Sequence, residues 1–231
     1  MRILIRLALM LMGLCAFLCM LASIAYTQVT SSSQMLSGFN QFADTSLKDV
    51  SASAYPDYAK AITGYLTGAR DDLSVTAEDG TERPGFTEKE TAHMQDVRAL
   101  VQGLKWFRFI SGGIALLVLG LFWLKSRGSA SREEMLKSML GGLAKGACLL
   151  LGIILALAVW GLVGFDSLFI QFHRLFFSNS LWLLNPREHL LIMLMPTPFF
   201  IWYAKQIMLS CWPILAAMAA VIVAGFRFGR K

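Results

Sequence analysis

Two histidines of this 231-residue sequence are candidates for chemistry, and one of them stands among phenylalanines, where a titratable ring is unusual. His93 lies in ETAHMQDV, and His173 lies in FHRLFF, beside phenylalanines. An apolar setting removes water from the charged imidazole, which lowers the pKa of the ring and keeps it neutral near pH 7. A neutral imidazole can accept a proton, so two of them that met could act as a general acid–base pair. These residues predict proton transfer between a nucleophile and a leaving group.

The phenylalanines near His173 would share its face if residues 167–178 form a helix. They are Phe169, Phe172, Phe176 and Phe177. The opposite face would be polar. An acid–base pair in this setting suits acyl transfer at the level of lipid headgroups. The alternative is an aromatic belt at a membrane surface in which His173 packs among the rings and has no chemical role.

The residues around His93 predict a helix that begins near Glu88. Thr87-x-x-Glu90 is a capping box, which explains Glu90 without any chemistry. His93 would then stand at the polar end of an apolar stripe, with Asp96 three residues further on and within reach. The plainer alternative is a half-buried histidine whose hydrogen bonds are satisfied.

The elements that must position these residues are membrane-spanning helices. Hydrophobic residues make up 56% of the chain, and its mean hydropathy is +0.57. These values exclude an ordinary soluble domain. Three apolar stretches, 7–25, 106–124 and 146–165, are long enough to cross about 30 Å of hydrocarbon.

A fourth span lies in the apolar run from Leu190 to Phe226, which is too long for a single crossing. We expect residues 190–203 to be interfacial or re-entrant and residues 206–226 to form the span. Pro213 would kink that span.

Lysine and arginine gather beside the spans, on the sides that the positive-inside rule assigns to the cytoplasm. They are Arg2, Arg6, Lys125, Arg127, Arg132, Lys137, Lys145, Arg227, Arg230 and Lys231. The net charge of +6 therefore reflects membrane topology rather than nucleic-acid binding. Both termini are expected in the cytoplasm. We expect the first span to remain as an anchor, because it is longer than the apolar core of an ordinary signal peptide.

These features predict an α-helical integral membrane protein with four transmembrane helices and a small, mainly helical extracellular cap. The cap could contain a short hairpin within DLSVTAEDGTERPGF and a helix that turns Tyr58, Ile62 and Tyr65 toward a core. The predicted parts are transmembrane helix 1 (1–26), the extracellular cap (27–105), transmembrane helix 2 (106–124), a cytoplasmic loop (125–145), transmembrane helix 3 (146–165), an extracellular interfacial aromatic segment (166–205), transmembrane helix 4 (206–226) and a cytoplasmic tail (227–231).

The geometry of the cap has one further requirement. His93 lies thirteen residues before Trp106, about 20 Å along an unbroken helix. That distance would hold the ring far above the membrane. We therefore expect the helix to bend or end near Gly103, so that His93 reaches His173.

Three stretches together resemble the bacterial lipoprotein intramolecular transacylase (Lit) family: ETAHMQDV (90–97), FHRLFFSNSLWLL (172–184) and LIMLMPTPFF (191–200). Chain length, four spans and the order of the motifs are similar too. The resemblance implies an enzyme of the bacterial plasma membrane with its active site at the extracellular face. The family moves the sn-2 acyl chain of a diacylglyceryl lipoprotein onto the amino group of its N-terminal cysteine, which gives a lyso-form lipoprotein.

The resemblance also assigns roles to residues. It makes His93 and His173 catalytic, and it places Asp96, Asn179 and Trp182 at motif positions that support them, with Glu90 nearby. Phe169, Phe172, Phe176 and Phe177 would line the substrate pocket. The family has an aspartate shortly before the Leu-Ile pair, whereas this chain has REHLLI. Glu188 is the candidate replacement, and His189 is expected to be a solvated interfacial residue.

The implied reaction needs no cofactor such as ATP or coenzyme A, because conversion of an ester to an amide is downhill and both groups belong to one substrate. The expected partners are diacylglyceryl lipoproteins and membrane lipid, with no nucleic acid.

Two alternatives belong to other classes of protein. One is a non-enzymatic lipid or lipoprotein binder in which the histidines are incidental. The other is a metal-dependent membrane hydrolase with Glu90, His93, Asp96 and His173 as ligands, although the sequence lacks the HExxH spacing.

Overall fold

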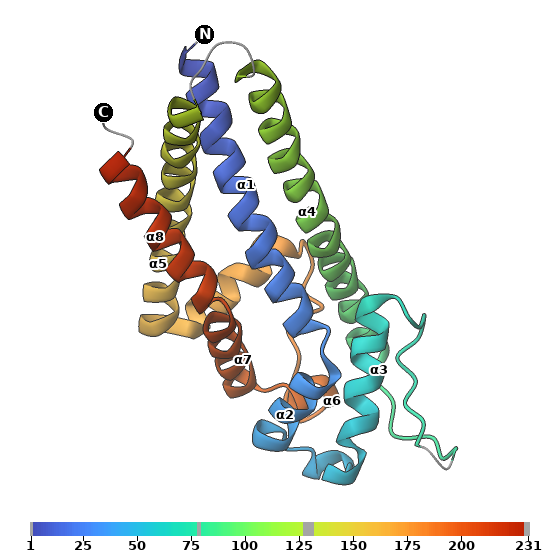
Figure 1. Ribbon diagram of the computed structural model, residues 1–231. Coiled ribbons are helices and arrows are strands. Elements are labelled where there is room, and N and C mark those ends of the chain that lie inside the picture. The colour runs from blue at the N-terminus through green and yellow to red at the C-terminus, as the bar shows by residue number, and fades with distance from the viewer. Residues whose placement is uncertain (1, 78–79, 127–131, 229–231) are drawn as a thin grey trace. The chain divides into compact units, whose positions relative to one another are not determined.

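The computed structural model describes residues 2–77, 80–126 and 132–228, which form helices and their connections (Figure 1). The α-helices are α1 (Arg2–Val29), α2 (Ser32–Phe42), α3 (Tyr55–Thr67), α4 (Glu88–Ser126), α5 (Arg132–Phe176), α6 (Leu190–Leu194), α7 (Thr197–Ser210) and α8 (Trp212–Phe228). Two 3-10 helices, η1 (Ser46–Lys48) and η2 (Ala52–Ala54), precede α3. No strand occurs in the part of the chain that the structure describes, in agreement with the predicted α-helical class. Some residues named above lie outside the described residues. They are Asp79 of the predicted hairpin and three of the basic residues beside the spans, Arg127, Arg230 and Lys231.

The chain divides into two compact units, and α4 and α5 each contribute to both. The first unit combines Met1–Ile24, Lys105–Val163 and Ser210–Lys231. The second unit combines Ala25–Leu104 with Gly164–Leu209. Every site residue that the sequence predicts belongs to the second unit.

Three helical segments are long and apolar enough to cross a membrane: Ile3–Val29, Glu88–Ser126 and Glu133–Phe176. Helices α7 and α8 would make a fourth if the pair acts as one bent span. The pair is interrupted at Cys211, two residues before Pro213. This interruption confirms the kink predicted there, because proline fits the first turn of a new helix but not the interior of a continuous one.

The predicted break in α4 is wrong. We expected the helix from Glu88 to bend or end near Gly103, but α4 continues to Ser126 as one element. A Cβ on Gly103 would meet nothing within 4 Å, so this glycine is an open position on the helix surface. The interruption is in α5 instead, where Gly164 has a non-helical backbone (φ −160°, ψ 75°).

The helices also extend past the predicted spans. Helix α5 begins at Arg132, so the described residues 132–145 are helical although they were expected in a loop, and the helix continues through residues 166–176. Hydropathy indicates the apolar length that a bilayer needs, whereas backbone hydrogen bonds extend a helix into its polar flanks.

Glycine allows close helix packing in the first unit. A Cβ on Gly146 of α5 would lie 2.5 Å from the backbone nitrogen of Leu14 on α1, and a Cβ on Gly142 would overlap Leu9. Small residues let two helix backbones approach closely where hydrocarbon surrounds them.

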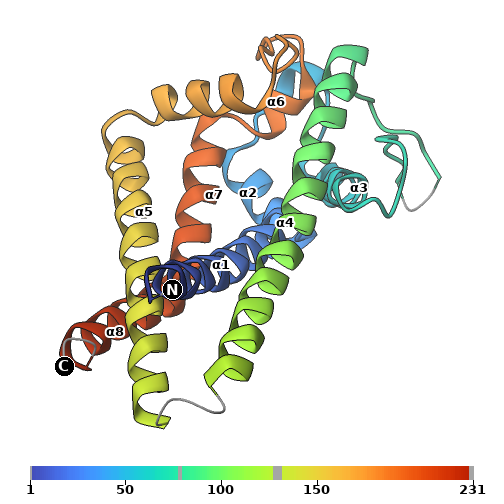
Figure 2. The same cartoon turned by 90° about the horizontal axis from the view of Figure 1, so that it is seen from above.

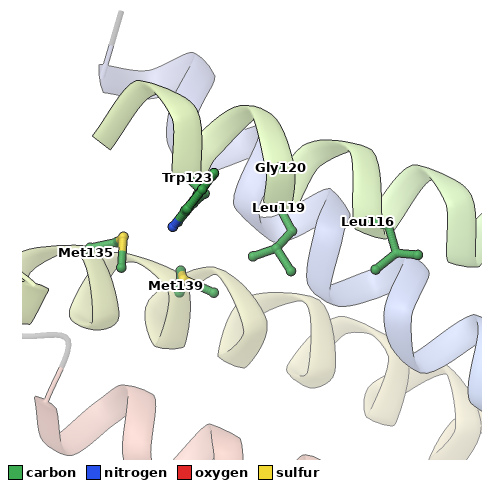
Figure 3. Close-up of a pocket in the computed structure, with 6 residues that line it drawn as sticks. All are labelled: Leu116, Leu119, Gly120, Trp123, Met135 and Met139. Atoms are coloured by element: carbon green, nitrogen blue, oxygen red, sulfur yellow. The ribbon is translucent and has the colours of Figure 1, made fainter. Parts of the chain in front are cut away.

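A cavity of about 450 Å³ also lies in the first unit, between α4 and α5 (Figure 3). It is lined by Leu116, Leu119, Gly120, Trp123, Met135 and Met139. None of these side chains titrates near neutral pH, so the cavity offers no group for acid–base chemistry.

The second unit has its own core of aromatic and aliphatic side chains. Tyr58, Ile62 and Tyr65 of α3 are buried, which confirms the predicted helix and its core-facing side. Helix α3 lies beside the N-terminal half of α4 (Figure 1 and Figure 2), where Gln102 donates a hydrogen bond to the carbonyl of Leu66 (2.6 Å). The predicted hairpin is reduced to a single antiparallel bridge between residues 76 and 82.

Candidate active site

The first turns of α4 carry one of the two histidines. The Thr87 backbone N–H donates to Glu90 Oε2 (2.7 Å), and the Glu90 N–H donates to Thr87 Oγ1 (3.3 Å). These two bonds form the predicted capping box and fix the start of the helix. Lys89, His93 and Asp96 consequently lie at positions i, i+4 and i+7, on one face of α4.

The other histidine, His173, lies near the end of α5, beyond the break at Gly164. The ring centroids of His93 and His173 are 6.1 Å apart, and the ring planes are inclined at 33°. The two side chains are only 7% and 8% exposed. The structure thus brings together two rings that lie 80 positions apart in the sequence.

Aromatic side chains enclose the histidine pair. The centroid of the His173 ring lies 4.2 Å from Phe169, 4.9 Å from Trp182 and 5.5 Å from Phe177. Phe177 also meets His93 edge-on, at 5.4 Å. These rings occupy positions that water would otherwise fill.

The remaining two predicted pocket residues lie further out. Phe172 contacts His173 at 5.5 Å, and Phe176 packs on Phe172 at 4.8 Å. Both are substantially exposed, at 41% and 51%. The predicted aromatic face therefore divides into inner walls, half-buried Phe169 and buried Phe177, and an exposed outer pair.

Burial lowers the pKa of both imidazoles, which lie outside the predicted spans 106–124 and 146–165. Loss of water is the main reason that the pKa of His93 falls from its ordinary 6.5 to about 4, and neighbouring His173 lowers it further, whereas Asp96 acts in the opposite direction. Burial also lowers the pKa of His173, against the effect of its hydrogen bond to Phe169. Both rings are consequently neutral at pH 7.

The hydrogen bonds of the two rings differ. His173 Nδ1 lies 2.8 Å from the carbonyl oxygen of Phe169. Because a carbonyl can only accept, Nδ1 carries the proton and Nε2 keeps a free lone pair. His93 Nδ1 is buried and has no hydrogen-bond partner among the described residues. A buried nitrogen of this kind leaves a position for a group that the protein does not supply.

Asp96 does not orient His93, although the sequence placed the two within reach. Its Oδ2 accepts a hydrogen bond from the side-chain amide of Asn179 (2.8 Å). The backbone carbonyl of Asn179 accepts the indole N–H of Trp182 (3.0 Å), and its Oδ1 accepts the backbone N–H of Leu181 (3.0 Å). Asn179 thus connects α4 to the turn that holds Trp182 against His173.

Two further contacts hold the segment after α5 against the same part of α4. Lys89 Nζ donates to the carbonyl of Leu183 (2.6 Å), and Glu90 Oε1 accepts the backbone N–H of Leu191 (2.6 Å). Glu90 is only 1% exposed, so its carboxylate fixes the start of α6 as well as that of α4. Sequence reasoning missed Lys89, although its spacing of four residues from His93 could have indicated it.

A family model described as "Lipoprotein intramolecular transacylase Lit" matches residues 9–200, a range that includes every predicted site residue. The chain belongs to this family. Its enzyme class is therefore that of an acyltransferase. No curated protein sequence matches the chain.

Solved structures of a Lit protein have the same fold. The membrane integral lipoprotein intramolecular transacylase Lit from Bacillus cereus is 17% identical, with a TM-score of 0.68, and the match covers 98% of this chain and 99% of that chain. Two structures of the Bacillus cereus protein with one histidine replaced, by arginine or by alanine, are 19% identical with TM-scores of 0.59. These matches cover 97% of this chain and 90% and 92% of those chains. The chain therefore has the helical fold of a membrane-integral Lit protein.

In this Lit family member, His189 is buried rather than solvated as we expected. Its Nδ1 accepts the backbone N–H of Asn185 (3.0 Å). The side-chain amide of Asn185 donates to Glu188 (2.8 Å), and its Oδ1 accepts the N–H of Arg187 (3.0 Å). Asparagine commonly closes a turn on itself in this way. Glu188 and His189 therefore shape the loop that leads into α6.

The carboxylates near the histidines are occupied by other contacts. Glu90 bonds to the starts of α4 and α6, and Asp96 bonds to Asn179. Within the described ranges, no three or more His, Cys, Asp or Glu side chains are arranged to hold a metal ion. The ligand set Glu90, His93, Asp96 and His173, which a metal-dependent hydrolase would need, does not assemble.

Proposed function

We propose that this protein moves the sn-2 acyl chain of a diacylglyceryl lipoprotein onto the amino group of its N-terminal cysteine, giving a lyso-form lipoprotein, and that His93 and His173 carry the acid–base chemistry. The observation that carries the proposal is the pair of neutral imidazoles, 6.1 Å apart and enclosed by aromatic rings, in a chain of the Lit family.

The reaction balances without a cofactor. The neutral cysteine amine attacks the ester carbonyl carbon, a C–N bond forms, and the bond from that carbon to the glyceryl oxygen breaks. One proton leaves nitrogen and one arrives at oxygen. The protein must mainly hold the amine near the ester, and such orientation can lower a barrier by roughly 7 to 11 kcal/mol.

His173 is the proposed base. Its Nδ1–H bond to Phe169 supports the tautomer with a free lone pair on Nε2. Nε2 takes the proton from the attacking nitrogen and returns it to the glyceryl oxygen, so the ring ends neutral. Trp182 and Phe177 exclude water that would compete for the proton.

His93 is proposed to donate a hydrogen bond to the oxygen that gains charge. Its Nδ1 is buried and has no hydrogen-bond partner among the described residues, so a substrate oxygen would supply the missing acceptor. Asp96, Asn179 and Glu90 act indirectly, because their bonds hold Trp182 and the segment before α6 in place.

Mass spectrometry of a reporter lipoprotein tests the proposal. Cells carry wild-type protein, His93→Ala or His173→Ala at equal membrane levels, and the N-terminal peptide of the reporter is analysed. Wild type should give N-acyl cysteine with a monoacyl glyceryl group, and neither variant should. His189→Asn is the matched control, since its amide oxygen can still accept the Asn185 N–H, and it should remain active. A diacyl peptide that wild type leaves unchanged would refute the proposal.

We also infer the predicted topology for this chain: four spans, cytoplasmic termini, and residues 27–105 and 166–205 outside. The positions of lysine and arginine beside the spans support it. In a chain without its native cysteines, an impermeant maleimide should label Ser53→Cys in intact cells and Ser138→Cys only after permeabilisation. Both serines are exposed, so the reverse result would exclude this topology.

A further inference from the structure

The part of α5 beyond Gly164 is an amphipathic helix with an exposed apolar side. At 100° per residue, Phe172, Leu175 and Phe176 fall within one arc, and Ser167 and Arg174 lie on the opposite side. The apolar residues are not covered by protein, since Leu175 is 77% exposed and Phe176 is 51% exposed. A patch of this kind on a helix next to a site usually has a ligand or a membrane against it.

The exposed patch is continuous with the buried histidines. Phe176 packs on Phe172, and Phe172 contacts both His173 (5.5 Å) and Phe177 (6.4 Å). The surface residues and the walls of the site therefore belong to one aromatic cluster. A chain of methylene groups could lie along it from the exterior to His173.

The chemistry of the patch limits what can bind to it. No charged or hydrogen-bonding side chain interrupts the arc of Phe172, Leu175 and Phe176, so the partner must be apolar. Gly164 follows directly on residues 146–163, an apolar stretch almost long enough to cross a bilayer. By chain continuity, the patch begins nine residues beyond this stretch, so an acyl chain that reaches from the hydrocarbon is the matching occupant.

We propose that the acyl chain of the lipoprotein substrate docks on the surface formed by Phe172, Leu175 and Phe176, so that substrates with long acyl chains bind more tightly than substrates with short ones. The inference rests on the proposed function, because it names where the transferred group is held. It also separates two kinds of residue among the predicted pocket residues. Phe169 and Phe177 enclose the reacting groups, whereas Phe172 and Phe176 bind the chain.

Kinetics with two synthetic diacylglyceryl peptides in mixed micelles test the docking surface. One peptide carries hexadecanoyl chains and the other carries butanoyl chains. Phe176→Ser and Leu175→Ser should raise KM for the long-chain peptide about tenfold, or about 1.4 kcal/mol, with little change in kcat. The butanoyl peptide should be unaffected. Ile170→Ser is the matched control, because Ile170 is an exposed apolar residue on the opposite side of the same helix, and it should change neither substrate.

Equal losses on both peptides, or no loss on either, would overturn the docking surface. A second readout separates this failure from failure of the proposed function. A diacylglyceryl peptide with a diazirine in its acyl chain is photolysed with wild type and with His93→Ala, and the attachment sites are mapped by mass spectrometry.

Attachment concentrated at residues 172–176 in both proteins supports docking, even if wild type transfers no acyl chain. Attachment spread equally over the most exposed span residues, Leu162 and Val163, would instead indicate general contact with lipid and contradict docking.

Discussion

His93 should titrate far below an ordinary histidine. Its pKa of about 4, against 6.5 for an exposed ring, is a difference of about 2.5 units, or about 3 kcal/mol in favour of the neutral form. At pH 5.5 about 3% of His93 would carry a proton, compared with about 90% of an ordinary histidine. The prediction can be measured by NMR of protein with isotopically labelled histidine in detergent micelles. Only three histidines are present, so one substitution at each assigns the signals.

Two variants should move this pKa in opposite directions. Phe177→Ala removes the ring that lies 5.4 Å from His93 and admits water, so the pKa should rise toward 6.5. Asp96→Asn removes the negative charge that favours the protonated ring, so the pKa should fall further, while the new amide oxygen can still accept the bond from Asn179. A wild-type midpoint at or above 6 would refute burial as the dominant cause, and a rise of the pKa in Asp96→Asn would refute the effect assigned to the Asp96 charge.

The same shift has a consequence for stability. Between pH 6.5 and pH 4 an unfolded chain binds a proton at His93 that the folded chain does not, so the free energy of unfolding decreases as the pH falls through this window. The stability lost through protonation of His93 should reach about 3 kcal/mol. Above pH 6.5 the free energy of unfolding should not change with pH through His93. In His93→Gln the free energy of unfolding should fall by about 3 kcal/mol less than in wild type between pH 6.5 and pH 4. A variant that unfolds with the same pH dependence as wild type would contradict the linkage.

Three further substitutions test the surroundings of the site and the helix packing. Glu90→Gln should lower the free energy of unfolding by about 1 to 3 kcal/mol in a denaturant titration, because an amide has one acceptor oxygen, so either Thr87 or the Leu191 N–H loses its acceptor. Asn179→Ala should lower kcat more than it raises KM, since the turn that holds Trp182 loses its side-chain bonds to Asp96 and Leu181. Asn179→Asp should also be less active than wild type, because the new carboxylate would face Asp96. Gly146→Val should destabilise the protein by about 1 to 3 kcal/mol in thermal unfolding, whereas Gly152→Val, where a Cβ meets nothing within 4 Å, should not.

The local features of the site could be predicted from the sequence because they depend on neighbours along one helix. The capping box of Thr87 and Glu90 needs only a spacing of three residues, and it is present. The aromatic side of His173 follows from helical periodicity in the same way. Both predictions use bonds or faces that a single helix determines by itself.

Predictions that depended on tertiary structure were less successful. Gly103 and Gly164 are both glycines in helical surroundings, and nothing in their immediate sequence states that only Gly164 interrupts the helix. Glycine lowers helix stability by about 1 kcal/mol, which is too little to force a break where packing favours continuity. The location of the break therefore had to come from the fold.

Polar contacts between distant segments were equally inaccessible. Glu90 and Leu191 are 101 residues apart, and Asp96 and Asn179 are 83 apart, so no spacing rule pairs them. His189 was misjudged for a related reason. It was expected to be a solvated interfacial residue, but a turn closed by the side chain of Asn185 places the ring inside the protein.

The partner of His173 favours one kind of nucleophile. In hydrolases with a Ser-His-Asp triad, a carboxylate on Nδ1 stabilises the imidazolium that forms when a weakly acidic hydroxyl is deprotonated. Here Nδ1 bonds to the neutral carbonyl of Phe169, which fixes the tautomer but supplies no charge, and burial further lowers the pKa of the ring. Such a base is poorly matched to an alcohol or water. It suits an α-amine, whose pKa is near 8. The neutral amine is already a nucleophile, so no base is needed before it attacks. Once the new C–N bond has formed, the nitrogen becomes acidic and gives up its proton readily. The bond of His173 Nδ1 to Phe169 thus supports the proposed transfer to an amine over hydrolysis.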